Sequence, residues 1–237
     1  MRKPALLLAL ALAACASQTP YASTVGILPP GSALTVNVAS AEVDAYAPAI
    51  GEPRDRFTIE ATAPAKGAQP PAPAMRPSRA GVTVLASDPL RSLLVRVPDG
   101  VTLHVESASG DVHVTNINGP ATVDARNGMV QIITPSYAQA RVGNGGLSVT
   151  MGAGDWPGTL HFSTQRGDIE VWVNENVPFH VHLHTANGSL FTDFALRGTS
   201  SGTSETIDGD VNGGGPRGID IESNAGVIRL LRLHPEA

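Results

Sequence analysis

The sequence is poor in aromatic residues, in cysteine and in clustered positive charge. Aromatic residues make up 4% of its 237 residues, and the single cysteine, Cys15, has no partner in the chain for a disulfide. Lysine and arginine are dispersed, so the basic footprint that nucleic-acid binding requires is missing. We therefore expect no nucleic-acid partner and no intrachain disulfide, and a core of small side chains rather than a thick aromatic one.

Recognisable catalytic motifs are missing as well. The sequence has no Gly-x-Ser-x-Gly elbow, no His-Glu-x-x-His pair and no Walker loop. Its candidate carboxylates are scattered among segments: Asp124, Asp168, Glu170 and Asp220. We expect no catalytic residues, no cofactor and no enzyme activity. The alternative is a carbohydrate-active β-helix enzyme, which would need two or more carboxylates within about 5–10 Å on a concave face.

What the chain does have is a repeat centred on glycine. Apolar or small residues stand seven, five and three positions before the glycine, and mostly apolar ones two and four positions after it. The six glycines are Gly110, Gly128, Gly145, Gly167, Gly188 and Gly226, at spacings of 18, 17, 22, 21 and 38 residues. A period near twenty indicates a stacked array of repeats.

Each repeat alternates strictly before its glycine, as in the segment from Thr159 to Thr164. Period two predicts a strand with one buried face, and Asn-Gly or Ser-Gly then predicts a turn. Equivalent positions keep their character between repeats, which favours parallel, in-register stacking. We predict an all-β fold, a single-stranded right-handed β-solenoid (β-helix) of repeats of about 20 residues. A β-meander of hairpins buries the same positions and is the alternative.

The N-terminus indicates export. Residues 1–14 have the basic start and short apolar run of a secretory signal peptide. They end in Leu12-Ala13-Ala14 before Cys15, which resembles the lipobox of bacterial lipoproteins. That resemblance implies cleavage before Cys15 and lipidation of its thiol; ordinary cleavage after Ala14 or Ala16 is the alternative.

Cleavage before Cys15 removes Arg2 and Lys3 and changes the net charge from −5 to −7. Because Ala16 rather than Asp follows the cysteine, the lipoprotein pattern favours the outer membrane, facing the periplasm or the exterior. We divide the remainder into a tether (15–30) and one domain (31–237). That domain has a Pro/Ala-rich loop at 64–77 and a Gly/Ser-rich loop at 197–217.

Two segments carry a family resemblance. Residues 94–101 read Leu-Val-Arg-Val-Pro-Asp-Gly-Val, and Glu106-Ser-Ala-Ser-Gly-Asp-Val112 follows. Together with Arg166-Gly-Asp-Ile169, these resemble the DUF4097 family of adhesin-type proteins over roughly residues 34–231. The resemblance implies a β-solenoid-like fold in a bacterial envelope protein and supplies no catalytic residues.

Histidines are the first candidate metal ligands. His180, His182 and His184 alternate with apolar residues, so all three face outward. His161 and His182 both stand six positions before a repeat glycine, which would make them direct neighbours, with α-carbons about 5 Å apart, in a solenoid. They could share a zinc or copper ion, or simply belong to a polar outer face.

Two shorter motifs resemble ligand-binding motifs, but ordinary loop or turn structure also accounts for them. Asp208, Asp210 and Asn212 match the start of a calcium loop, but Ile219 stands where the loop needs glutamate, and this favours a flexible acidic loop over a calcium site. Arg166-Gly167-Asp168 spells an integrin-binding tripeptide, but Gly-Asp recurs at Gly110 as turn chemistry.

The sequence thus predicts a non-catalytic cell-envelope lipoprotein, an adhesin-like or scaffold solenoid that presents a binding surface. Its partners would be the membrane, through the lipid anchor, and an envelope protein or polysaccharide. A carbohydrate-active enzyme and a metal-dependent binding module are the alternatives, and the oligomeric state is open.

Overall fold

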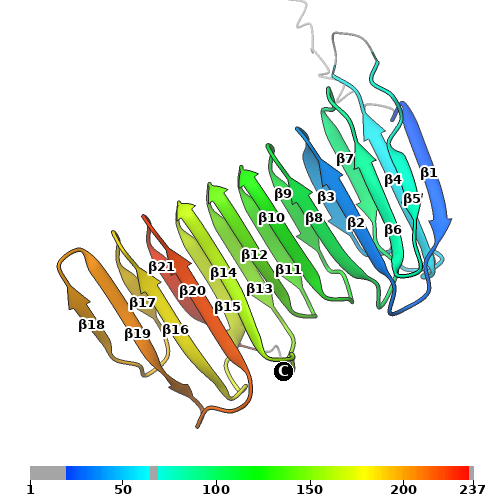
Figure 1. The fold of residues 1–237 in the computed structure, drawn as a ribbon. Coiled ribbons are helices and arrows are strands. Elements are labelled where there is room, and N and C mark those ends of the chain that lie inside the picture. Colours follow the sequence, from blue (N-terminus) through cyan, green and yellow to red (C-terminus); the bar gives the residue numbers. More distant parts are fainter. Residues whose placement is uncertain (1–19, 65–68, 235–237) are drawn as a thin grey trace, which may run out of the picture.

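The chain folds into two long β-sheets that lie face to face (Figure 1). The computed structural model describes residues 20–64 and 69–234, and no α-helix occurs in these two ranges. In pairing order, the 10-stranded sheet consists of β1 (Ala22–Ile27), β4 (Arg56–Thr62), β7 (Ser92–Arg96), β3 (Glu42–Tyr46), β9 (Val112–Thr115), β11 (Val130–Thr134), β13 (Leu147–Met151), β15 (Ile169–Asn174), β21 (Ile228–Leu233) and β17 (Leu190–Thr192). The 11-stranded sheet consists of β18 (Gly198–Ser201), β19 (Ser204–Val211), β16 (Phe179–Thr185), β20 (Gly218–Ser223), β14 (Thr159–Arg166), β12 (Ala138–Asn144), β10 (Ala121–Asn127), β8 (Thr102–Ser107), β2 (Ala33–Val38), β6 (Gly81–Ala86) and β5 (Ala74–Pro77).

Each repeat is one coil, with a strand in each sheet and the glycine turn between them. In the central coils, from β8–β9 to β14–β15, neighbouring strands run parallel, and equivalent residues pair. Val123, for example, pairs with Val105 on one side and Ala140 on the other. The predicted stack of parallel coils is confirmed, and the meander is wrong for this region because its successive strands would reverse direction.

The coils do not stack in chain order at the two ends. The last coil, β20–β21, lies between β14–β15 and β16–β17 and pairs in parallel with both. At the other end β6–β7 lies outside β2–β3, which pairs with β8–β9. The C-terminal strands are therefore seen between earlier ones in Figure 1.

The repeat glycines form one column along the stack. A Cβ built at Gly145 would collide with the carbonyl oxygen of Gly128, and one at Gly226 would collide with that of Gly167. The same contact links Gly188 to Gly226, in the spatial order of the coils rather than the chain order. Glycine recurs because the turn of one coil leaves no room for a side chain on the next.

Side chains join successive turns through hydrogen bonds. The Thr164 hydroxyl donates to the Gly145 carbonyl (3.3 Å), and Ser223 donates to that of Gly167 (3.4 Å). Asp168 Oδ1 accepts from the backbone N–H of Val227 (2.9 Å). Asp168 therefore stabilises the turn, as expected from the recurrence of the Gly-Asp dipeptide in the repeats.

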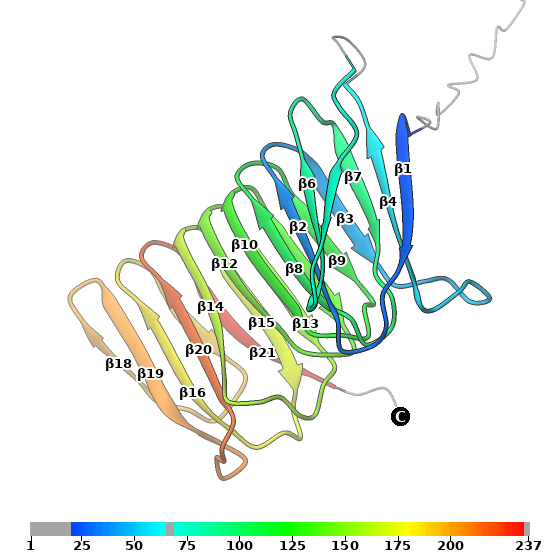
Figure 2. The ribbon, with the colours of Figure 1, turned by 45° about the vertical axis from the view of Figure 1, so that its right-hand side comes forward.

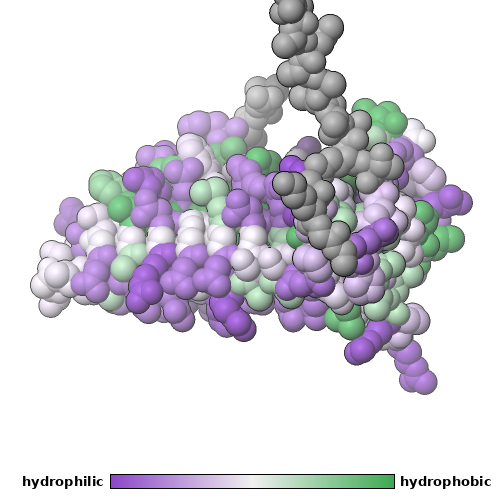
Figure 3. Space-filling view, turned by 90° about the horizontal axis from the view of Figure 1, so that it is seen from above, coloured by the Kyte–Doolittle hydropathy of each residue, from purple (hydrophilic) through white to green (hydrophobic). Residues whose placement is uncertain are grey.

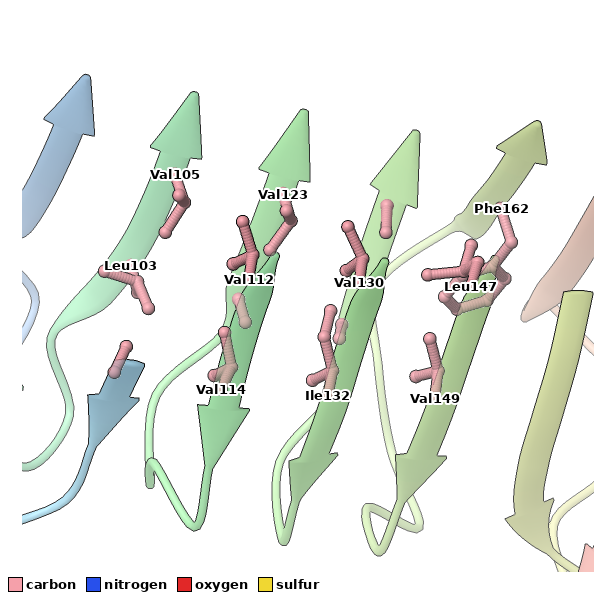
Figure 4. Close-up of a cluster of buried hydrophobic side chains, with 14 of the residues drawn as sticks. Leu103, Val105, Val112, Val114, Val123, Val130, Ile132, Leu147, Val149 and Phe162 are labelled. Atoms are coloured by element: carbon pink, nitrogen blue, oxygen red, sulfur yellow. The ribbon is translucent and has the colours of Figure 1, made fainter. Parts of the chain in front are cut away.

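The core lies between the sheets and consists of the inward residues of every coil (Figure 4). The predicted inward residues are all buried: Val123, Phe162, Val171, Val181 and Leu183. Among the residues predicted to be exposed, His161 is exposed, whereas Thr122, Glu170 and His182 are only half-exposed. Partners on the adjoining strands cover part of these three side chains.

Antiparallel strands cover both ends of the 11-stranded sheet and the N-terminal end of the 10-stranded sheet (Figure 2). Strands β4 and β1 extend the 10-stranded sheet beyond β7, and β5 pairs with β6 in the other sheet. At the C-terminal end β19 pairs with β16, and β18 returns against β19. Such strands cover hydrogen-bonding edges that would otherwise be open to another chain.

These end strands correct three sequence predictions. The segment predicted as a tether (15–30) contains β1, the predicted loop at 64–77 contains β5, and the predicted loop at 197–217 contains the β18–β19 hairpin. The sequence did not indicate these strands because they are rich in Gly, Ser, Ala and Pro. Antiparallel edge strands do not need the alternating apolar pattern of a stacked coil. Viewed from above, the stack shows a narrow pale band, with mainly hydrophilic residues on one side and a mixture of hydrophilic and hydrophobic residues on the other (Figure 3).

Within the described ranges, no helix is sufficiently long and apolar to cross a membrane.

Candidate functional site: the outer face of the 11-stranded sheet

A groove of about 930 Å³ crosses the outer face of the 11-stranded sheet beside the glycine turns. Because side chains alternate between the two faces of a strand, the polar residue between each pair of buried ones points into this groove. The outward residues in register across it are Asn37, Glu106, Asp124, Arg141, Ser163 and Glu222. The floor of the groove is thus a row of three carboxylates, one amide, one hydroxyl and one guanidinium.

One atom of this groove lacks a partner. Asn37 Oδ1 is buried and has no hydrogen bond within the protein. A buried acceptor without a donor costs free energy, and such groups are rare in folded proteins. This acceptor is buried beneath the groove, so the accessible polar groups are the other side chains of the row.

A second cluster lies where β14, β20, β16 and β19 adjoin, next to a smaller hollow of about 400 Å³. Histidine and aspartate alternate across these strands. His161 Nδ1 lies 3.2 Å from Asp220 Oδ2, and His182 Nδ1 lies 3.2 Å from Asp208 Oδ2. The cluster is an unbroken row of imidazole and carboxylate groups.

The other two histidines of β16 also contact side chains of β19. His180 Nδ1 lies 3.0 Å from Asp210 Oδ1, and His184 Nδ1 lies 3.1 Å from the Thr206 hydroxyl. The hydrogen bond that His180 donates to Asp210, with smaller electrostatic contributions from Asp208 and Asp210, raises the pKa of His180 above its ordinary value. The carboxylates of β19 thus favour the protonated form of this imidazole.

The predicted direct contact between His161 and His182 is wrong. Both residues pair with Asp220, which stands between them on β20. The predicted column of outward residues exists, but two strand spacings, about 10 Å, separate the two histidines. The alternating pattern determines which residues of a coil face inward. It does not determine which other coil lies beside it.

The predicted calcium-loop residues do not form a loop either. Asp208 and Asp210 lie on the regular strand β19, opposite His182 and His180. Asn212 follows this strand, and its side-chain amide donates to the carbonyls of Glu175 (2.7 Å) and Val177 (3.1 Å). The two aspartates join the histidine cluster, whereas Asn212 fastens the end of the hairpin.

The sequence reasoning missed Asp220 and Glu222 as partners of the histidines. One ligand atom from each of His182, Asp220 and Glu222 lies within 4.8 Å of the other two. The signal was present, because Asp220 stands six positions before Gly226, at the same place in the repeat as His161 and His182. This position was not recognised as adjacent to the histidines, because the coils were expected to stack in chain order.

A comparable group lies on the outer face of the other sheet. Glu42, Asp44 and His113 also bring one ligand atom each within 4.8 Å, with His113 Nε2 4.0 Å from Glu42 Oε1. The remaining predicted site residue, Cys15, lies outside the described residues.

The fold and this polar outer face define a class of protein: an all-β repeat protein built of stacked, largely parallel coils. The family model described as Toastrack DUF4097 matches residues 99–231, more than half of the chain. The chain belongs to this family, in agreement with the resemblance seen in its turns.

Two solved structures resemble the chain at low identity. A candidate cell adhesion protein from Clostridium sporogenes ATCC 15579 is 9% identical, with a TM-score of 0.47, and the match covers 90% of this chain and 99% of that one. A candidate adhesin from Bacteroides fragilis NCTC 9343 is 10% identical, with a TM-score of 0.32, and the match covers 90% and 98%. No match was found among the curated proteins.

Proposed function

We propose that this protein is a non-catalytic, adhesin-type or scaffold lipoprotein of the bacterial cell envelope. The groove on the 11-stranded sheet is its binding surface for an envelope polysaccharide or protein. The single observation that carries the proposal is this groove, with its row of charged and polar side chains.

The anchor follows from the N-terminal sequence. Residues 1–14 act as the signal peptide, Cys15 carries the lipid, and the domain faces the periplasm or the exterior from the outer membrane. We also infer that the coils wind in the right-handed sense, with about 20 residues in each. The lipid test is fractionation: Cys15→Ala releases the protein from membranes, and a fully membrane-bound variant would contradict the anchor.

The groove is tested by charge reversal at its centre. Arg141→Glu should weaken binding of the purified protein to envelope preparations at least tenfold, because Arg141 is exposed within the row of acidic residues. Arg56→Glu makes the same charge change at an exposed position on the other sheet and serves as the control. Equal binding by both variants and the wild type would remove the groove from the function.

One observation favours the carbohydrate-active alternative. Glu106 and Asp124 are register partners on neighbouring strands and both line the groove. Their side chains are exposed, however, whereas the acid of a glycosidase is held in an apolar pocket. Release of reducing sugar from envelope polysaccharide by the wild type, abolished by Asp124→Asn, would establish this alternative in place of ours.

A further inference from the structure

We propose that His182, Asp220 and Glu222 form a binding site for one divalent zinc ion at the junction of β16 and β20. The three ligand atoms come from neighbouring strands and lie within 4.8 Å of one another. Ligands of one tetrahedral zinc ion lie about 3.4 Å apart, because each stands about 2.1 Å from the metal. Closure needs each pair of ligand atoms to approach by at most about 1.4 Å.

The donor atoms suit zinc in kind and in number. One imidazole nitrogen and two carboxylate oxygens make a three-ligand site, and water would fill the fourth position. The adjoining hollow of about 400 Å³ is lined by His182 and Asp220 and gives an ion access from solvent. Arg217, which also lines it, is bound to Asp155 at 2.6 Å, so its charge is already neutralised.

A second and independent observation is an orphaned atom. Asp220 Oδ1 is buried and has no hydrogen-bond partner, although Oδ2 of the same carboxylate contacts His161. A buried carboxylate oxygen without a donor is costly, and a bound cation removes that cost. None of the ligands in the group on the other sheet has such an atom.

The surrounding residues fix the orientation of the ligands. His182 Nδ1 lies 3.2 Å from Asp208 Oδ2, which leaves Nε2 as the nitrogen for the metal. Metal-binding histidines usually donate their other ring N–H to such a carboxylate. In the same way His161 orients Asp220 from the opposite side.

The position of the site gives it a role in the fold. The site joins β20, a strand of the last coil in the sequence, to β16. In chain order β16 would lie beside β14, but β20 lies between them. Zinc would therefore hold together one of the junctions at which the coils do not follow the order of the chain. An ion that binds only the folded protein stabilises it by RT ln(1 + c/Kd), where c is the concentration of free ion.

The test uses the full chain carrying Cys15→Ser, so that no thiol competes for the metal. Titration with zinc chloride, followed by calorimetry, should show one ion bound. Asp220→Asn and Glu222→Gln should each weaken binding at least tenfold, whereas His104→Gln, an equivalent outward position on β8, should not change it. Circular dichroism of each variant verifies the fold, and Glu222, being exposed, gives the substitution less able to disturb it.

A second readout separates this site from other sources of binding. Free zinc at about 100 times its dissociation constant should increase the folded-to-unfolded ratio of the Cys15→Ser protein about 100-fold, and this gain should disappear in Asp220→Asn. Absence of zinc binding would overturn the proposal. So would binding that survives in both variants and is lost in His113→Gln, since that places the ion on the other sheet.

Discussion

The central coils and the C-terminal end of the stack use the same repeat in two different ways. From β8 to β15 the chain advances by one coil at a time, and each glycine turn lies on the one before it in sequence. After β15 the chain passes over one position, makes β16–β17 and the β18–β19 hairpin, and returns to fill the gap with β20–β21. The last coil therefore lies inside the stack, between two coils that are distant from it in sequence.

The two regions differ in how far apart in the sequence their paired strands lie. In the central coils, neighbouring strands are 17 to 22 residues apart, whereas Phe162 and its partner Ile221 are 59 apart. Closing the longer loop costs more chain entropy and delays that contact during folding. We expect the central coils to depend mainly on packing and the end to depend also on its side-chain contacts.

The largest expected effect tests packing where the two regions meet. Phe162 on β14 is among the largest fully buried side chains. Phe162→Ala should cost about 3–5 kcal/mol of unfolding free energy, because the cavity cannot close within a stack of coils. Urea titration measures this loss. Phe191→Ala, on the edge strand β17 where the ring is 53% exposed, should stay within about 0.5 kcal/mol.

The next effect tests the glycine column. Gly145→Ala places a Cβ against the Gly128 carbonyl at a φ of 144°, and should cost about 2–4 kcal/mol. Gly154→Ala is the control, since its Cβ would meet only Val177 at 4.0 Å. Equal urea midpoints for the two variants would mean that the turns are not stacked in contact.

A smaller effect tests the hydroxyls that join the turns. Thr164→Val removes the hydrogen bond to the Gly145 carbonyl while keeping the shape, and should cost about 1–2 kcal/mol. Thr206→Val, on the hairpin strand β19, loses only the half-buried contact with His184 and should cost less than half as much. Thermal unfolding of the pair compares the two regions, and a larger loss at Thr206 would reverse the comparison.

The smallest effect concerns the turn that leads into the central coils. The hydrogen bonds from Asn118 (2.8 Å) and then Arg54 (2.7 Å) lower the pKa of Asp99 below its ordinary value. A lowered pKa contributes stability at neutral pH that is lost as the pH falls through the folded-state value. Asp99→Asn should thus cost no more than about 1 kcal/mol at pH 7, and the difference should shrink below about pH 4. A difference that stays constant down to pH 3 would disprove this linkage.

The sequence predicted the part of the fold that depends on local pattern. Alternation around the repeat glycines identified the buried residues of the central coils, and their shared character indicated parallel stacking. The order of coils at the ends could not be predicted in this way, because β14, β16 and β20 carry equivalent patterns and could pair in any order.

The same limit applies to the candidate site. Sequence identified His161 and His182 as occupants of one outward column, and Asp208 and Asp210 as candidate ligands. It could not place Asp220 between the two histidines, nor the aspartates of β19 beside His182 and His180. Both depend on contacts between segments separated by 26 residues or more.

The central claim is that the last coil lies between β14 and β16, and cysteine cross-linking tests it most directly. In the Cys15→Ser protein, Ser163→Cys with Glu222→Cys joins register partners, which disulfide geometry can bridge. Ser163→Cys with His184→Cys joins strands on either side of β20, about 10 Å apart and beyond disulfide reach. We predict rapid oxidation of the first pair and none within the chain for the second. Efficient cross-linking of positions 163 and 184, with none between 163 and 222, would show that the coils stack in chain order and would contradict this account.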